Sequence, residues 1–300
     1  MEKINFKVDQ DNANLRIDVF LARHLKDHSR TSLKNLIVNG CVLVNKQKIK
    51  PHYCLKINDE IEIEFPPKQE SSLSSQNIPL EIIYEDQDLI VVNKPEGMVV
   101  HPGAGNREST LVNALLYHTK ELSNISPERP GIVHRLDKET SGVMVIAKNN
   151  FTHLELVKQF KVHSVKRRYI ALVRGRVEFK EGVIDVPIHR HPLRRKNMAV
   201  SFSPDAKQAQ TNYRTIKRFD NFTLLELIPK TGRTHQLRVH LSYLKHPILG
   251  DSKYGNKKDF PRLALHAKDL GFHHPGKEKF IEFTSPLPKD IIKVIGDITL

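Results

Sequence analysis

Cysteine is scarce in this chain of 300 residues, which contains only Cys41 and Cys54. Two cysteines cannot build a disulfide framework, and these two do not form a Cys-x-x-Cys pair. The chain also lacks any apolar run near the ~20 residues that a membrane-spanning helix needs. Its first ten residues, MEKINFKVDQ, have no apolar signal core. We therefore expect a cytoplasmic protein without a membrane segment.

Acidic residues are also in short supply. The chain has 34 Asp and Glu against 48 Lys and Arg, so its formal net charge is +14 and its sequence pI is about 9.6. Such a surplus predicts a polyanionic partner, most often nucleic acid, with an anionic membrane surface as the alternative. The hydrophobic fraction of 39% allows real cores, and at about 150 residues per domain the length predicts two domains.

Nucleotide-binding and metal-binding motifs are missing as well. Gly103 and Gly105 suggest a phosphate loop, but Glu108 stands where a dinucleotide fingerprint needs its third glycine. No Gly-Lys-Ser/Thr follows them. The sixteen histidines are scattered, without companion ligands at helical spacing. We predict neither a nucleotide cofactor nor a metal site.

A small basic unit is predicted over residues 15–65. Apolar spacing predicts a helix from Leu15 to Leu25 and a second helix over 32–38, capped by Ser29 or Thr31. Short strands follow an Asn-Gly turn. Basic residues lie on or between the helices: Arg16, Arg23, Lys26, Arg30 and Lys34. An ordinary solvated face gives the same pattern, but the overall charge favours an RNA-binding surface.

The prolines and serines of residues 66–77 predict a linker, because they show no periodicity that could bury a core. A larger domain is predicted over residues 78–300. Strands and helices do not alternate regularly there, so we predict an α+β fold with a mixed or antiparallel sheet. Periodicity predicts strands at 81–84, 89–93, 166–173, 209–218, 222–228 and 280–284, and helices at 110–118, 150–160, 234–244 and 288–295.

The stretch from Arg129 to Lys148, RPGIVHRLDKETSGVMVIAK, is the most informative part of the sequence. Apolar residues flank a charged centre, which predicts a strand, a short charged loop and a second strand. In the loop core only Asp137 can act as a nucleophile or base without help, and the neighbouring cations Arg135 and Lys138 favour its ionised form. A structural ion pair would give the same pattern, so the spacing leaves both interpretations open.

Three motifs carry a resemblance to one enzyme family. HRLDKETSG resembles the signature of the RluA family of pseudouridine synthases, which implies that Asp137 is catalytic. RRYIALVRG is similar to the family pattern (K/R)xYxALVxG, which implies that Tyr169 stacks on the target uracil. KTGRTHQLRVH resembles the third family motif, and this implies that Arg233 pairs with Asp137. NKPEGMVVHPGAGN resembles a segment beside the family's active site.

The resemblance covers nearly the whole chain. RIDVFLARH and SRTSLKNLIVNGCVLVN resemble the S-four domain, a small αL-type RNA-binding module. The implied catalytic domain has a mixed, mainly antiparallel sheet with a central active-site cleft. The implied reaction converts uridine in RNA to pseudouridine without a cofactor, on a base flipped out of its stack. Whether Asp137 attacks C1′ or removes the 2′ hydrogen stays open.

The resemblance also predicts RNA contacts and a substrate class. The expected substrate-binding residues are Arg135, which would fill the vacated space, and His134, Lys94, His101, Arg195, Arg16, Arg30 and Lys34. The combination looks most like members that act on large-subunit (23S) ribosomal RNA, with transfer RNA as the alternative. We expect a monomer. An inactive ribosome-associated RNA-binding protein is a third interpretation, which the intact motif residues oppose. A glycoside hydrolase would need two carboxylates flanking the bond, and only Glu139 is near.

Overall fold

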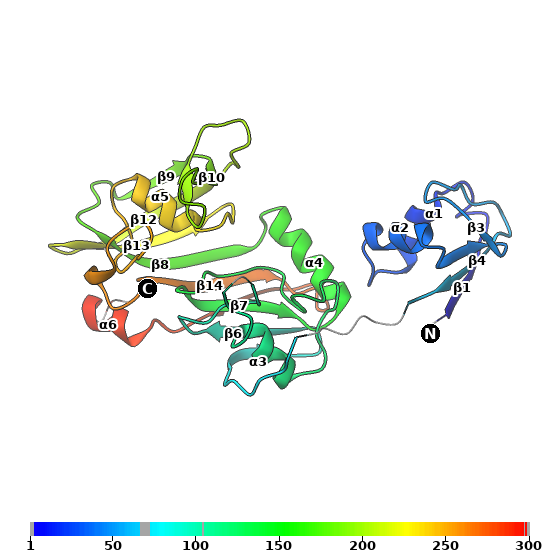
Figure 1. Ribbon diagram of the computed structural model, residues 1–300, viewed down its shortest axis with the longest axis horizontal. Coiled ribbons are helices and arrows are strands. Elements are labelled where there is room, and N and C mark those ends of the chain that lie inside the picture. The colour runs from blue at the N-terminus through cyan, green and yellow to red at the C-terminus, as the bar shows by residue number, and fades with distance from the viewer. Residues whose placement is uncertain (1–2, 67–72, 104, 297, 299–300) are drawn as a thin grey trace.

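The computed structural model describes residues 3–66, 73–103, 105–296 and 298 of the chain. Within these residues the chain forms two units, and the hydrophobic core of the first is separate from those of the second (Figure 1). Residues 67–72, in the centre of the predicted linker, lie outside the described residues. The predicted domain boundary over 66–77 therefore stays a prediction.

The first unit packs two helices against a four-stranded antiparallel sheet, with strand order β1-β4-β2-β3. Ser29 caps α2 as predicted, since its Oγ accepts a hydrogen bond of 3.1 Å from the N–H of Ser32. The sheet begins earlier than the predicted range of 15–65, because β1 pairs with β4 along its whole length. The elements are β1 (Lys3–Lys7), α1 (Ile17–His24), α2 (Arg30–Val38), β2 (Val42–Val44), β3 (Gln47–Lys48) and β4 (Glu60–Glu64).

The second unit is built on a nine-stranded sheet with the order β5-β6-β7-β14-β8-β13-β12-β9, and β15 pairs with β14. Its first half contains β5 (Glu81–Glu85), β6 (Leu89–Lys94), α3 (Leu111–His118), β7 (Ser141–Ala147), α4 (Asn150–Lys161) and β8 (Lys166–Arg174). Its second half contains β9 (Glu181–Asp185), β10 (Ile188–Arg190), β11 (Met198–Val200), β12 (Gln210–Arg218), β13 (Phe222–Pro229), α5 (Gln236–Tyr243), the 3₁₀ turn η1 (Lys257–Asp259), β14 (Leu265–His273), β15 (Phe280–Thr284) and α6 (Lys289–Ile295).

Every strand pair in this sheet is antiparallel except β7 with β14. The predicted α+β class with a mixed, mainly antiparallel sheet is therefore confirmed. Gly142 permits the parallel contact. Its φ is +120°, and a Cβ at this position would collide with the backbone of Ala267 in β14. The glycine of the ETSG sequence thus fixes where β7 enters the sheet.

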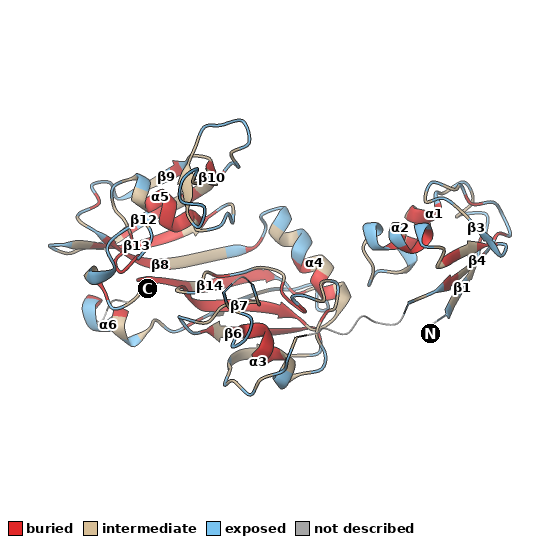
Figure 2. Cartoon of the chain, viewed as in Figure 1, coloured by how far each residue is buried: buried red, intermediate tan, exposed pale blue. Residues whose placement is uncertain are grey.

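The strands are buried on both faces near the middle of the sheet (Figure 2). Leu89 and Val91 of β6 pack in one core with α4, whereas Ile90 and Val92 pack in another core with α3. This alternation is what the two-residue period of a strand requires when helices cover both faces. None of the helices in the described part of the chain is long and apolar enough to cross a membrane.

Two local predictions are wrong. The stretch before Asp137 is not a strand, since it makes only one isolated bridge, between Ile132 and Ile146, and is otherwise turns. Helix α5 is not capped by Thr234. It begins after His235, whose backbone is left-handed at φ 56° and whose side chain makes no capping hydrogen bond. Both errors lie where tertiary contacts, and not local periodicity, set the backbone.

Candidate active site

Asp137 lies in the loop that leads into β7. Its neighbour Leu136 is 5% exposed and packs in the core beneath the sheet, which anchors the loop. The Asp137 carbonyl accepts a hydrogen bond of 3.1 Å from the N–H of Thr140, closing a turn. The carboxylate remains 18% exposed and faces a cavity of about 530 Å³. The loop therefore presents one carboxylate to a space of the size that small-molecule sites have.

His134 holds the other side of this loop. Its Nε2 accepts a hydrogen bond of 3.1 Å from the N–H of Val145, and its ring stacks on Phe160 at 4.6 Å between centroids. Burial, with a contribution from the Arg167 cation, lowers the pKa of His134 to about 3, so the ring is neutral. His134 lines the cavity, as the prediction of substrate contact requires, but its Nε2 is already used by the protein backbone.

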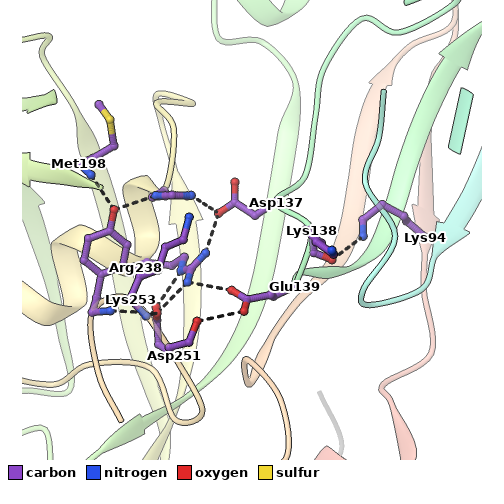
Figure 3. A network of polar contacts seen from close by, with 11 residues as sticks. Lys94, Asp137, Lys138, Glu139, Met198, Arg238, Asp251 and Lys253 are labelled. Carbon is purple, nitrogen blue, oxygen red and sulfur yellow. Dashed lines mark hydrogen bonds and ion pairs between the residues drawn. The ribbon is translucent and has the colours of Figure 1, made fainter. Parts of the chain in front are cut away.

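Arg238, in the first turn of α5, is the fixed cation of the site. The side chain is 2% exposed and lies among three carboxylates (Figure 3). Its Nε and Nη2 each donate to Asp251 over 2.7 Å, and Nη2 also donates to Glu139 over 3.0 Å. Nη1 lies 3.5 Å from Asp137 Oδ2. Burial opposes the charge, but Asp251, Asp137 and Glu139 raise the pKa of Arg238, so the cation is permanent.

The predicted pairing of Arg233 with Asp137 is wrong. Arg233 lines the cavity, but its Nε donates to the carbonyl of Gln208 over 3.0 Å and its side chain is exposed. Since α5 begins at Gln236, the residue that the helix turns inward is Arg238. Nor do the near neighbours in sequence pair with Asp137. Lys138 donates to Asn106 over 3.2 Å, and Arg135 is exposed and forms no ion pair among the described residues.

Tyr169 lies on β8, between Leu227 of β13 and Ala267 of β14 in the sheet register. Its side chain lines the same cavity as Asp137. Burial raises the pKa of Tyr169, the Arg167 cation opposes this, and the Asp137 charge adds to it. The phenol therefore stays protonated at neutral pH, and the cavity has one aromatic wall and one carboxylate wall. The structure brings together these two predicted residues.

Lys94 is the clearest departure from the predicted substrate contacts. Its side chain is fully buried, and its ammonium donates to the carbonyls of Pro95, Met98 and Lys138 over 2.7, 2.9 and 3.3 Å. Burial lowers the pKa of Lys94 to about 7, against the attraction of Asp137 and Glu96. Lys94 cannot reach RNA in this position. It ties the NKP segment to the residue that follows Asp137 (Figure 3).

Of the other predicted contacts in the second unit, one lines the cavity and two do not. Arg135 lines the cavity and is exposed. His101 does not line the cavity, although burial and the charge of Arg135 lower its pKa. Arg195 is exposed in the turn between β10 and β11, away from the cavity lining, and its carbonyl accepts a hydrogen bond of 3.2 Å from Arg190.

The predicted RNA-binding residues of the first unit converge on Asp18, which is fully buried at the start of α1. Arg16, Arg30 and Lys34 approach its carboxylate to 3.1, 2.9 and 3.7 Å, and their side chains remain 45%, 52% and 44% exposed. Burial alone would raise the pKa of Asp18, but the hydrogen bonds from the two arginines lower it. One buried anion thus holds three half-exposed cations together on the surface.

One cluster in the described part of the chain has the composition of a metal site: Asp86, Asp88 and His274. His274 Nδ1 accepts hydrogen bonds from the backbone N–H groups of Gly276 and Lys277, so Nε2 carries the hydrogen that it donates to Asp86 over 2.8 Å. The ammonium of Lys277 also lies 2.8 Å from Asp86. Asp86 and His274 are therefore committed to each other and to Lys277, in an ion-pair network. Asp88 stands apart from it, since its Oδ1 accepts a hydrogen bond of 2.9 Å from Asn149 and its Oδ2 has no partner among the described residues.

Comparison with known proteins agrees with this fold and site. Residues 88–243 match the RNA pseudouridylate synthase family, and residues 15–61 match the S4 domain. The first match covers more than half of the chain and includes Asp137, Tyr169 and Arg238. The chain belongs to the RNA pseudouridylate synthase family. It is an isomerase that acts on RNA, with an S4 domain ahead of the catalytic domain.

Relatives are similar along nearly the whole chain. The uncharacterized RNA pseudouridine synthase YlyB of Bacillus subtilis (strain 168) is 42% identical and covers 99% of both chains. Ribosomal large subunit pseudouridine synthase D of Zymomonas mobilis is 44% identical over 92% of this chain and 91% of its own. Human RNA pseudouridylate synthase domain containing 1, a solved structure, matches with a TM-score of 0.59 and 29% identity, covering 70% of this chain and 84% of its own.

Sequence reasoning missed Arg238, His235, Asp251 and Tyr254. One signal could have found Arg238: it stands between Leu237 and Val239 in a helix whose neighbouring residues are almost all buried. A charged residue in such a position must be paired, because burying it alone is costly. Asp251 and Tyr254 give no local signal, since only the fold brings the loop after α5 beside Asp137.

Proposed function

We propose that this protein isomerises uridine in large-subunit (23S) ribosomal RNA, with Asp137 as the catalytic residue. One observation carries the assignment of Asp137. It is the carboxylate that enters the cavity while paired with a permanent, buried cation, Arg238. The ribosomal substrate is supported by the S4 domain and by relatives such as the Zymomonas mobilis enzyme, whose name specifies the ribosomal large subunit.

In this reaction the C1′–N1 bond breaks, the uracil turns within the cavity, and C5 bonds to C1′. The hydrogen on C5 leaves and N1 gains a proton, so the product is an isomer and no co-reactant is consumed. Attack of Asp137 at C1′ and removal of the 2′ hydrogen both need an ionised carboxylate that faces the ribose. The contact with Arg238 supports that state and fixes the direction of the carboxylate.

Tyr169 supplies the face on which the flipped uracil stacks. A base removed from a helix loses its stacking partners, and an aromatic side chain replaces them. Tyr169 lines the cavity together with Asp137, and its phenol is protonated at neutral pH. Arg135 is exposed at the rim, where it can enter the space that the base leaves in the RNA.

Phosphate contacts are assigned to two basic surfaces. The first is the cluster around Asp18 in the S4 domain, formed by Arg16, Arg30 and Lys34. The second is the exposed turn between β10 and β11, which carries Arg195. Phosphate neutralisation by such groups makes RNA affinity fall with rising salt. We further propose that the enzyme is a cytoplasmic monomer.

The test is to incubate purified protein with 23S ribosomal RNA and with transfer RNA, and to map pseudouridines in both. We expect new pseudouridine in the ribosomal RNA only. Asp137→Asn should abolish it while RNA binding remains. Asp220→Asn, in the exposed turn between β12 and β13, is the matched control and should be fully active.

Modification of transfer RNA alone would overturn the ribosomal assignment and leave the isomerase intact. Substantial turnover by Asp137→Asn in a single-turnover assay would overturn the catalytic assignment. Binding without modification of either RNA would favour the remaining alternative, an RNA-binding protein without catalysis.

A further inference from the structure

A second group, the imidazole of His235, faces Asp137. His235 Nε2 lies 3.9 Å from Asp137 Oδ2, and the imidazole is 11% exposed. On the other side of the ring, Nδ1 lies 2.7 Å from the hydroxyl of Tyr254. That hydroxyl also accepts a hydrogen bond of 2.8 Å from the backbone N–H of Met198 in β11. These contacts form a continuous line from a surface hairpin to the carboxylate (Figure 3).

The direction of the hydrogens in this line follows from the Met198 contact. A backbone N–H can only donate, so the Tyr254 oxygen accepts there and its own hydrogen is free to point to His235 Nδ1. Nδ1 is the one acceptor that the described contacts offer to this hydrogen, so we take Nδ1 as the acceptor, and a neutral imidazole then carries its hydrogen on Nε2. The N–H of His235 therefore faces Asp137, whereas the other tautomer would set a lone pair against the carboxylate.

The backbone conformation of His235 supports this contact with Asp137. His235 has φ 56° and ψ 18°, in the left-handed region that non-glycine residues seldom adopt. Such a conformation costs free energy and persists only where surrounding contacts over-determine it. Here the conformation starts α5, places Arg238 in the first turn, and sets the imidazole between Tyr254 and Asp137. The backbone of His235 thus directs both its own imidazole and the Arg238 guanidinium toward Asp137.

We propose that His235 and Tyr254 are positioning residues for Asp137. Tyr254 fixes the tautomer of His235, and the Nε2–H of His235 orients the Asp137 carboxylate, which also faces Arg238. This inference rests on the proposed role of Asp137. At 3.9 Å the His235 contact is longer than a hydrogen bond, so it shortens when RNA fills the cavity, as catalytic contacts in empty sites do.

The same line connects the carboxylate with a proposed RNA-binding surface. Met198 ends the turn that carries Arg194, Arg195 and Lys196, which are all exposed. Phosphates that bind to this turn would fix β11, and β11 holds Tyr254 through a backbone group that no side-chain substitution removes. RNA bound to the β10–β11 hairpin is thereby linked to the orientation of the Asp137 carboxylate.

The first experiment removes single atoms from this line. Tyr254→Phe keeps the ring, including its position 5.4 Å from the Arg238 guanidinium, and loses only the hydroxyl. Tyr243→Phe, at the exposed end of α5, is the matched control. We expect Tyr254→Phe to lower the single-turnover rate at saturating RNA about 10- to 100-fold, as small misplacements of catalytic groups do, with RNA affinity changed less than about twofold. Tyr243→Phe should match the wild type.

The second experiment separates the two nitrogens of His235. In His235→Gln the amide can donate from the place of Nε2, whereas in His235→Asn it reaches only the place of Nδ1. Asparagine accepts the left-handed backbone at least as well as glutamine, so the comparison is not biased toward the rescue. We expect His235→Gln to be about tenfold more active than His235→Asn. Equal activity of the two, or Tyr254→Phe with the rate of Tyr243→Phe, overturns the proposal.

A third measurement does not depend on activity. The ¹⁵N chemical shifts of the His235 ring report which nitrogen carries the hydrogen. We expect hydrogen on Nε2 in the wild type and a mixture of tautomers in Tyr254→Phe. Hydrogen on Nδ1 in the wild type overturns the proposal whatever the RNA substrate is. Failure of the proposed substrate would show instead as a wild-type enzyme that modifies another RNA.

Discussion

The two units of this protein gather charge in opposite ways. In the S4 domain, one buried aspartate, Asp18, holds three cations whose side chains are about half exposed. In the catalytic domain, one buried arginine, Arg238, holds the three carboxylates Asp137, Glu139 and Asp251. Each hub is a single ion with almost no exposure, and each determines where its partners stand.

The difference lies in which charge reaches the solvent. Around Asp18 the cations extend outward, so the cluster offers positive charge to a phosphate backbone, and its task is binding. Around Arg238 the carboxylates remain mostly covered, and only one of them, Asp137, faces the cavity. A desolvated pair of this kind acts through fixed direction and charge, which suits chemistry. The same arrangement, a buried ion surrounded by partners of opposite charge, therefore serves RNA affinity in the S4 domain and reactivity in the catalytic domain.

The largest expected effect follows from removing the catalytic hub. Arg238→Met leaves three carboxylates without their cation, and breaking a buried pair costs about 3–5 kcal/mol of stability. We expect loss of stability of this order and loss of detectable turnover. Arg233→Met, whose Nε contacts only a carbonyl, is the matched control and should keep most activity. If Arg233→Met loses more activity in single-turnover assays and more stability in thermal unfolding than Arg238→Met does, the role given to Arg238 is wrong.

Lys94 gives the next effect, because it braces the loop that carries the catalytic carboxylate. Lys94→Met removes the donor that the carbonyls of Pro95, Met98 and Lys138 share in partly buried contacts, and a buried partner left unsatisfied costs about 1–3 kcal/mol. We expect chemical denaturation to show a loss of about 3 kcal/mol and a slower chemical step. Lys138→Met, which loses one exposed contact to Asn106, is the control. Equal stability of the two variants would show that Lys94 does not brace the loop.

Disrupting the cluster around Asp18 should have a smaller effect than disrupting the cluster around Arg238. The change in RNA affinity should also have the opposite sign to the one that the net charge predicts. Asp18→Asn makes the protein one charge more positive, yet it removes the anion that holds Arg16, Arg30 and Lys34 together. We expect RNA affinity to fall about three- to tenfold, since each scattered side chain must now be ordered on binding. Asp11→Asn, at an exposed position in the same unit, is the control for charge alone. Tighter binding by Asp18→Asn would refute the organising role of Asp18.

The smallest expected effect concerns stability at low pH, and it comes from a buried histidine that belongs to neither charge cluster. Burial lowers the pKa of His266 to about 4, with smaller contributions from Arg262 and Lys268. Below pH 6.5 the unfolded chain binds a proton at this residue and the folded chain does not, so the free energy of unfolding falls as the pH drops from 6.5 toward 4. We expect His266 to contribute about 1 kcal/mol of this loss at pH 5.5, measured by denaturant unfolding at pH 7.5 and 5.5. His266→Asn should reduce the pH dependence by that amount, while the buried His134 keeps its own contribution, and the exposed His52→Asn should leave the dependence unchanged.

The elements with strong local signals were predictable from the sequence. The spacing of apolar residues predicted β6, β8, β13, α3 and α4 to within a few residues, because each element buries a run of apolar side chains. The capping residue Ser29 was also named among the candidates. Strand β1 was missed, since its alternating pattern lies in a short stretch outside the predicted unit.

The site was predictable only where a residue acts from its own motif. Asp137 and Tyr169 were named and lie in one cavity. The partner of Asp137 was assigned to Arg233 and is Arg238, because the motif contains two arginines and the start of α5 decides which one turns inward. Lys94 was expected to contact RNA on the strength of the resemblance alone. Its burial depends on carbonyls from residues up to 44 positions away.

The single parallel pair of strands has a consequence for the order of synthesis. β14 stands between β7 and β8 in the sheet, and its contact with β7 joins residues 125 positions apart. A chain that is still being made displays the open edges of β7 and β8 until residues 265–273 have left the ribosome. Contacts this distant in sequence form slowly, and unpaired edges invite aggregation meanwhile. The cleft around Asp137 is therefore a late product of folding, completed when the last long strand is inserted.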